Sequence, residues 1–187
     1  AEYDYTCIFE YAQGQRMAPG PPGPSEASHA KQDTQGPREG RGQLLSYAAA
    51  SIGDRLPSLA VSESQEIINL KNDFRLAGRH RASNIHTDEE FARQNIFGGK
   101  VNAGPATMSY LDQMLQLSFP LRAFYEGGSL LMRAIEPFRA GDTVTFQGEV
   151  TGKRLEEGKK IVECRVKGIN QRGGLVSLSD AALVMGE

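Results

Sequence analysis

The stretch from Leu76 to Phe119 constrains the fold of this chain more than any other segment. Its centre is the pair Gly104-Pro105, which opens a run with apolar residues at helical spacing, and Pro120 stops that run. A glycine at the cap followed by a proline is typical of a helix start, so the spacing predicts a central helix over Pro105–Phe119. The first turn of a helix leaves backbone N–H groups without intrahelical partners at the positive end of the helix dipole. Such a start can hold a carbonyl oxygen that gains negative charge. The apolar residues of this run, expected mainly in the core, are Met108, Leu111, Met114 and Leu115.

A polar loop with a histidine precedes this helix. It ends in Asn84-Ile85-His86-Thr87-Asp88, and a short helical run follows over Glu89–Gln94. Asp88 has the chemistry of an N-cap for that run. The imidazole of His86 titrates near neutral pH and can pass a proton in either direction. A histidine loop directly ahead of a helix start therefore indicates a candidate site, and the alternative is a loop histidine that is hydrogen-bonded to backbone.

The rest of the chain predicts one further helix and five strands. A first strand is expected over Ser58–Ser62, and a helix over Glu66–Ala77, with Ser62 and Gln65 as a capping box. From residue 128 onward the apolar residues alternate with period two, which indicates strands separated by glycine-containing turns. One central helix followed by consecutive antiparallel strands favours an α+β fold in which a curved sheet wraps the helix. The later strands are expected over Ser129–Ile135, Thr143–Leu155, Ile161–Asn170 and Leu175–Met185.

The N-terminal part of the chain has a different composition. Ala1–Tyr11 alternates in the manner of a strand, either as an extra edge strand of the same domain or as an arm exchanged with a second subunit. Gly14–Gly42 is rich in Gly, Pro, Ser, Gln and charged residues, so it cannot bury enough apolar surface to offset its ordering entropy. We therefore expect an arm and linker over residues 1–51 and a single domain over residues 52–187.

The string NIHTDEEFARQNIFGGKVNAG, from Asn84 to Gly104, resembles the hydratase motif of MaoC-like (R)-specific enoyl-CoA hydratases. In that family an Asp is followed by Asn-Pro, an aliphatic residue and His, and a His-Gly further on opens the central helix. The stretch from Gly128 to Thr143 is similar to the family's strand and P-x-x-x-G-D turn, and Ile52–Pro57 is similar to the opening of its domain. The resemblance covers roughly Ile52 to Val184.

This resemblance implies a hotdog fold, with a long central helix wrapped by a curved antiparallel sheet. It implies syn addition or removal of water at an enoyl-CoA or enoyl-ACP thioester, which needs no cofactor. His86 would be the catalytic group, and the Gly104 N–H would hold the thioester oxygen. A homodimer or higher homo-oligomer is expected, because hotdog sites are commonly completed at a subunit interface.

The chain departs from the family motif at several positions. The Asp position falls on Arg81, or on Arg79 if the extra loop residues are placed after Gly78. We expect these arginines to contact coenzyme A phosphates or an acyl carboxylate, and the alternative is a solvated basic loop. The family's Asn-Pro falls on Ser83-Asn84 and its His-Gly on Ala103-Gly104. The candidate substrate-binding residues are Arg79, Arg81, Ser83, Asn84, Phe97, Gly98, Gly99 and Ala103.

These departures leave other functions open. A hotdog subunit without catalytic activity could bind an acyl thioester or support a catalytic partner. A hotdog thioesterase would place its acid on the central helix, where Asp112 is the only acidic residue. Asp88 is an alternative replacement for the missing base, and the glycines at 98 and 99 serve either acyl-chain approach or loop geometry alone.

Charge and cysteine content exclude other classes. The net charge of −2 gives no electrostatic footprint for nucleic acid, and no apolar run reaches membrane-spanning length. Cys7 and Cys164 lie far apart in sequence, so neither a disulfide framework nor a metal cluster is expected. Cys164 sits in a strand pattern and is expected to pack. The cytoplasm is the expected compartment.

Overall fold

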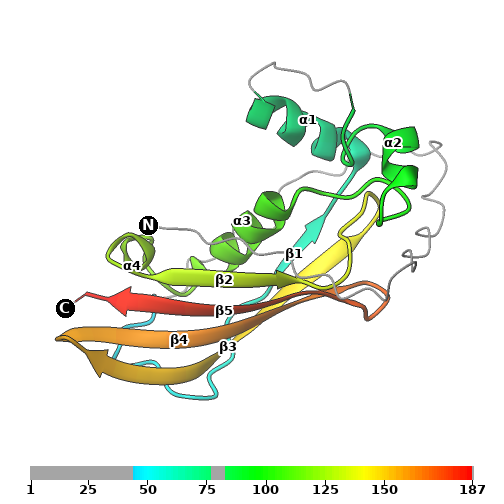
Figure 1. Ribbon diagram of the computed structural model, residues 1–187. Coiled ribbons are helices and arrows are strands. Elements are labelled where there is room, and N and C mark those ends of the chain that lie inside the picture. Colours follow the sequence, from blue (N-terminus) through cyan, green and yellow to red (C-terminus); the bar gives the residue numbers. More distant parts are fainter. Residues whose placement is uncertain (1–43, 77–82, 187) are drawn as a thin grey trace.

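The computed structural model describes residues 44–76 and 83–186, with helices and strands that follow one another along a single chain path (Figure 1). The element order begins with a strand and two helices, continues with the central helix, and ends in strands. The elements are β1 (Leu59–Ser62), α1 (Gln65–Leu76), α2 (Glu89–Gln94), α3 (Gly104–Leu115), α4 (Arg122–Tyr125), β2 (Ser129–Ala134), β3 (Thr143–Glu156), β4 (Lys159–Asn170) and β5 (Leu175–Met185).

The strands form one curved sheet in the order β1-β3-β4-β5-β2, and every neighbouring pair is antiparallel. Helix α3 lies along one face of this sheet, with α1 and α2 beyond its N-terminal end (Figure 1). A helix wrapped by a curved antiparallel sheet is the hotdog arrangement, so the predicted fold class is confirmed.

The core lies between α3 and the sheet. Side chains alternate across each strand, and the register pairs Val150 of β3 with Cys164 of β4, so both face the helix. Leu111 and Met114 of α3 are fully buried against this face, which confirms the prediction that they belong to the core. Burial raises the pKa of the Cys164 thiol to about 12, so this cysteine packs and is unsuited to act as a nucleophile at neutral pH.

A glycine on β3 allows α3 to approach the sheet closely. A Cβ atom at Gly148 would lie 2.8 Å from the Met114 Cε atom and 3.1 Å from the Leu56 Cδ1 atom. Real Cβ atoms almost never show contacts as short as the first of these. A side chain at residue 148 would therefore require the flexible end of the Met114 side chain to shift.

The structure corrects the predicted boundaries of two helices. Helix α3 ends at Leu115 and not at Phe119, because the next residues form tighter turns in which the Leu117 and Ser118 N–H groups donate to carbonyls three residues back. Helix α1 is capped by Ser64 and not by Ser62, since the Ser64 Oγ accepts from the Ile67 N–H. Ser62 remains in β1, where its hydroxyl lies 2.7 Å from the Thr143 hydroxyl.

Residues just before the predicted domain also contact the core. Ala50 is buried, and its carbonyl accepts from the Lys153 ammonium at 2.6 Å. The Leu45 N–H donates to the Ser118 carbonyl at 2.7 Å. The boundary between residues 51 and 52 stays a prediction, and the predicted N-terminal strand and the linker lie outside the described residues.

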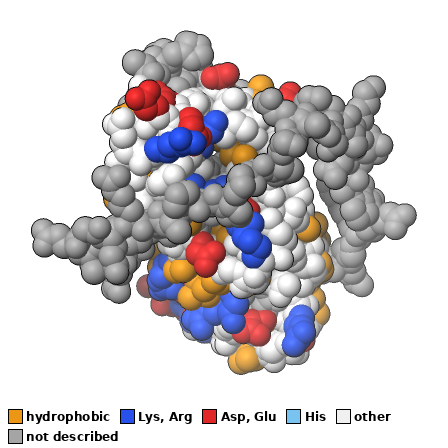
Figure 2. All heavy atoms as spheres, turned by 90° about the vertical axis from the view of Figure 1, so that its right-hand side faces the viewer, with side chains coloured by type: hydrophobic (Ala, Val, Ile, Leu, Met, Phe, Trp, Pro, Cys, Tyr) orange, Lys and Arg blue, Asp and Glu red, His pale blue; other side chains and the backbone are white. Residues whose placement is uncertain are grey.

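The coloured part of the surface in Figure 2 carries positive and negative side chains next to each other, with small hydrophobic areas between them. On the outer face of the sheet, Asp180 accepts from both Arg133 at 3.1 Å and Arg165 at 2.9 Å. No helix within residues 44–76 and 83–186 is long and apolar enough to cross a membrane.

Candidate functional site

His86 lies in the turn between α1 and α2 and points one ring nitrogen at the backbone ahead of α3. Its Nδ1 atom lies 2.9 Å from the Val101 carbonyl oxygen. A carbonyl can only accept, so Nδ1 carries the hydrogen and the neutral ring keeps its lone pair on Nε2. The Val101 N–H also donates to the Ile85 carbonyl at 3.2 Å. Two hydrogen bonds thus join the histidine loop to the segment that leads into α3.

The side chain of Asn84 builds the turn that carries His86. Its Oδ1 atom accepts from the His86 N–H at 2.9 Å and from the Thr87 N–H at 3.1 Å. Such an Asx-type turn fixes the backbone locally. From α1, the Gln65 amide donates to the His86 carbonyl at 2.9 Å. Asn84 therefore organises the loop through its own side chain.

Asp88 caps α2, as predicted. Its Oδ1 atom accepts from the Phe91 N–H at 3.0 Å. That backbone hydrogen bond, followed by a side-chain hydrogen bond from Ser83, lowers the pKa of the Asp88 carboxyl below its usual value. A carboxylate held in this way is a poor proton acceptor at neutral pH. The alternative in which Asp88 replaces the missing base gains no support from this geometry.

The first turn of α3, which is fully described, contains one backbone N–H group without a hydrogen bond, that of Gly104. The Ala103 N–H donates to the Asn102 Oδ1 atom at 2.9 Å, and Pro105 has no N–H. The N–H groups of Ala106 and Thr107 both donate to the Ala103 carbonyl, at 3.0 and 3.3 Å. Among residues 103–107, all of them described, the Gly104 N–H is the one for which no hydrogen bond is found. Ala103, and not Gly104, is the N-cap residue, which shifts the predicted helix start by one position.

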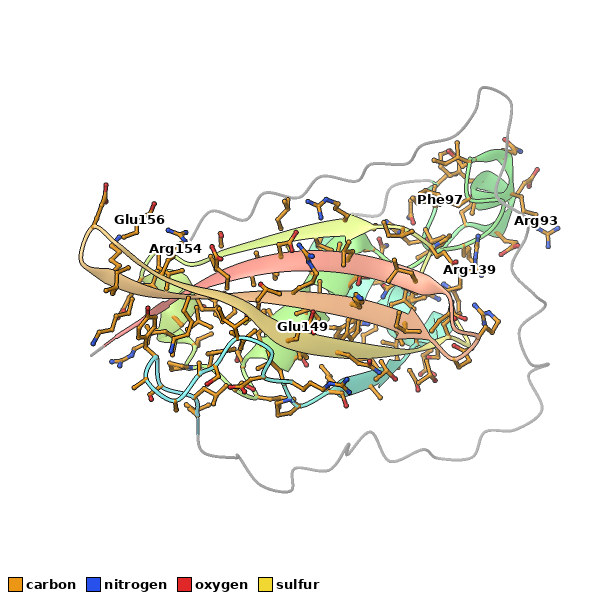
Figure 3. The ribbon with its side chains drawn as sticks, turned by 90° about the horizontal axis from the view of Figure 1, so that it is seen from below. Arg93, Phe97, Arg139, Glu149, Arg154 and Glu156 are labelled. Carbon is orange, nitrogen blue, oxygen red and sulfur yellow. The ribbon has the colours of Figure 1, made fainter. Side chains whose placement is uncertain are left out.

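The loop at Phe97-Gly98-Gly99 is held by Arg139 from the turn before β3. The guanidinium donates to the Phe97 carbonyl at 2.5 Å and to the Lys100 carbonyl at 3.0 Å. Figure 3 shows Phe97 and Arg139 at the same end of the sheet, next to α2. Gly98 has φ +64°, a conformation that glycine adopts without a steric penalty. Loop geometry thus accounts for Gly98, and contact with an acyl chain stays a prediction.

A buried polar cluster beside this site was missed by sequence reasoning. The Glu63 Oε1 atom accepts from the Tyr110 hydroxyl at 2.5 Å, from the Asn102 amide at 2.8 Å and from the Lys71 ammonium. The Lys71 ammonium also contacts the Tyr110 hydroxyl and lies 4.7 Å from the centroid of its ring. Burial, and then the Glu63 carboxylate, raises the pKa of Tyr110. The four residues lie on different elements, so no local pattern in the sequence points to them.

Asp112, the candidate acid of a thioesterase, lies away from the start of α3. Asp112 lies eight residues after Gly104, about 12 Å along the helix axis. Its Oδ2 atom accepts from the Gln116 amide at 2.9 Å. Arg79 and Arg81 lie outside the described residues. Within those residues, no three His, Cys, Asp or Glu side chains form a group that could hold a metal ion.

A family model for the MaoC like domain matches residues 77–171, just over half of the chain. The MaoC-like dehydratase from Rhodospirillum rubrum shares 26% identity, with a TM-score of 0.60, over 77% of this chain and 97% of that chain. No curated protein matches the sequence.

Two other solved structures are similar in fold. The R-hydratase PhaJ1 from Pseudomonas aeruginosa is 18% identical, with a TM-score of 0.58, over 76% of this chain and 86% of that chain. A chain of the ChsH1-ChsH2 complex from Mycobacterium tuberculosis is 21% identical, with a TM-score of 0.56, over 73% of this chain and 98% of that chain.

Proposed function

Since the chain belongs to the MaoC-like domain family, we propose that it adds water to, or removes it from, an acyl thioester of coenzyme A or acyl carrier protein. The observation that carries this proposal is the bond from His86 Nδ1 to the Val101 carbonyl. It leaves Nε2 as the basic nitrogen, and Val101, which anchors the ring, lies three residues before Gly104 in the sequence. A base and an oxyanion donor thus belong to one continuous piece of structure.

In the proposed hydration, Nε2 of His86 accepts a proton from water while the water oxygen bonds to the β-carbon. The electron pair of the carbon–carbon double bond moves toward the thioester, which becomes an enolate, and the Gly104 N–H donates to its oxygen. The imidazolium then returns a proton to the α-carbon, and the thioester carbonyl re-forms. Syn addition places both new bonds on one face of the substrate, so a single imidazole can serve both steps. Dehydration follows the same steps in reverse.

A second candidate is a non-catalytic subunit that binds an acyl thioester. It is favoured by the arginine at the family's Asp position, whether Arg81 or Arg79, and by Ala103 where the family has the histidine of His-Gly. An arginine can hold a phosphate or a carboxylate through paired hydrogen bonds. A partner chain would then supply the missing catalytic group, as an assembly of two different subunits allows.

The experiment uses the full chain with crotonyl-CoA and longer trans-2-enoyl-CoA thioesters, followed by loss of the enoyl absorbance. Turnover supports the hydratase. In that case Arg81→Asp or Arg79→Asp, which restores the family residue, is expected to raise the rate. No turnover, with butyryl-CoA binding that weakens in Arg81→Ala or Arg79→Ala, supports the binding subunit. Arg165→Ala on the outer face of the sheet is the matched control. If the chain showed no turnover and no binding of butyryl-CoA, both proposals would be overturned.

The assembly is proposed to be a dimer or a higher homo-oligomer. Sedimentation of the full chain at several concentrations tests this directly. A monomer at all concentrations would remove the expectation that a second copy completes the site.

A further inference from the structure

The Glu63 carboxylate is a buried charge next to the start of α3. Its side chain is fully buried, while the Lys71 side chain is 31% exposed and pairs with it. A buried carboxylate is stable only if it is hydrogen-bonded and paired. Glu63 meets this requirement at its Oε1 atom through Lys71, Tyr110 and Asn102, which come from α1, α3 and the segment before α3, whereas its Oε2 atom is buried without a hydrogen-bond partner. The cluster therefore ties α1 and β1 to the beginning of the central helix.

Asn102 connects this charge to the backbone of α3. Its Nδ2 atom donates to Glu63, and its Oδ1 atom accepts from the Ala103 N–H at 2.9 Å. The two ends of an amide have nearly the same shape, so shape alone does not decide which end faces which neighbour. The negative charge of Glu63 does decide it, since only the NH₂ end can face a carboxylate. A rotated amide would oppose its NH₂ group to the Ala103 N–H and its carbonyl to Glu63.

This orientation determines which N–H remains available at the helix start. The Ala103 N–H is taken by Asn102, and Pro105 has none. The Gly104 N–H is the remaining donor of the first turn, as the hydrogen bonds of residues 103–107 show. The same β1–α1 segment holds the histidine loop, because Gln65 donates to the His86 carbonyl. One short piece of chain thus sets both halves of the site.

We propose that Glu63, acting through Asn102, is a positioning residue that aims the Gly104 N–H at the thioester oxygen. This inference rests on the proposed hydratase function. Neither side chain touches the reacting atoms; their effect is on the direction of a backbone donor. A misplaced donor at a developing oxyanion typically costs about 100-fold in rate.

The test compares Asn102→Ala and Glu63→Gln with Asn170→Ala as a matched control. Asn170 is also buried, and its Oδ1 atom also accepts backbone N–H groups, those of Arg172 and Gly174 in the β4–β5 turn. Asn102→Ala is expected to lower kcat for crotonyl-CoA hydration about 100-fold, with KM changed by less than about threefold. Glu63→Gln keeps an acceptor oxygen without the charge, so a loss of about tenfold is expected. Asn170→Ala is expected to lose stability and to keep the natural kcat.

Amide hydrogen exchange gives a readout that does not depend on activity. In Asn102→Ala the Ala103 amide is expected to exchange at least about tenfold faster, while the Leu111 amide in the middle of α3 stays protected. An unchanged kcat in Asn102→Ala, or a loss confined to KM or to the melting temperature, overturns the positioning role. An inactive natural chain refutes the proposed function instead. The Ala103 exchange rate then decides alone whether Asn102 fixes the start of α3.

Discussion

The two ring nitrogens of His86 have different proposed roles, and two substitutions distinguish the effects of losing each role. Nδ1 donates to the Val101 carbonyl, and Nε2 is the proposed base. Asparagine carries an NH₂ group at about the position of Nδ1 and has no counterpart of Nε2. His86→Asn therefore keeps the contact with Val101 and removes the base, whereas His86→Ala removes both.

The magnitudes follow from the contacts. Loss of a general acid–base group typically costs about 100- to 10,000-fold in rate, so both substitutions are expected to lower kcat within that range. A neutral hydrogen bond contributes about 1 kcal/mol, and a buried carbonyl left without a partner costs about 1–3 kcal/mol. Val101 is buried, so His86→Ala is expected to lose about 1–2 kcal/mol of stability. At about 2–4 °C per kcal/mol, its melting temperature falls by a few degrees, and that of His86→Asn stays close to the natural value.

The assay pairs hydration of crotonyl-CoA with urea unfolding of the same preparations. The expected pattern is an equal loss of rate in both variants and a loss of stability in His86→Ala alone. A kcat in His86→Asn equal to that of the unsubstituted chain would show that Nε2 is not the base. Equal destabilisation of the two variants would show that the bond to Val101 is not what holds the histidine loop.

Three further substitutions test the stability of the fold. Gly128→Ala would place a Cβ atom 2.5 Å from the Ala123 carbonyl oxygen, a backbone atom that cannot move alone, so a loss of about 3 kcal/mol or failure to fold is expected, measured by urea unfolding. Lys71→Met leaves the Glu63 carboxylate without its cation and is expected to cost about 3 kcal/mol, at the low end for a buried pair because Lys71 is partly exposed. The Cys164 thiol has its pKa raised from 9.0 to about 12 in the folded chain, so the unfolded thiol ionises first and stability falls as pH rises from about 9 to about 12. In Cys164→Ala the unfolding free energy is expected to fall less steeply with pH across this range, and the difference in slope approaches about 1.4 kcal/mol per pH unit.

Local patterns in the sequence predicted most of the sheet. The period-two alternation located β5 at its observed bounds and β3 and β4 to within two residues, because alternation reflects burial on one face and needs no knowledge of distant partners. The predicted end of α3 was wrong, because the spacing of apolar residues does not show whether a buried residue belongs to a helix or to a turn. Phe119 continues the helical spacing of apolar residues and is buried, yet it reaches the core from a turn.

The cap of α1 was decided by a contact between distant parts of the chain. Ser62 and Ser64 are equally suitable N-caps by local chemistry. Ser62 pairs instead with Thr143, 81 residues further on, and this pairing keeps it in β1. Only the next available serine is left to cap the helix. A choice made by strand pairing cannot be found from the residues around the helix start.

The candidate site divides in the same way. His86 and Gly104 could be proposed from the sequence because the loop, the glycine and the proline lie within one short stretch of it. Glu63 was not found, since its partners Asn102 and Tyr110 lie 39 and 47 residues away and come together only in the fold. No spacing rule connects a residue after a strand with an asparagine before a helix.

The energetics of this cluster support an orienting role rather than a stabilising one. Replacing a buried ion pair by apolar side chains of similar volume is often neutral or stabilising, so stability alone gives little reason to keep Glu63 and Lys71 in the interior. A charged acceptor does what no apolar group can do, which is to fix the direction of the Asn102 amide and, through it, the Ala103 N–H. An apolar replacement of the whole cluster should therefore keep or raise the unfolding free energy while lowering kcat. The opposite result, a large loss of stability with kcat unchanged, would mean that the cluster serves only to hold β1 and α1 against α3.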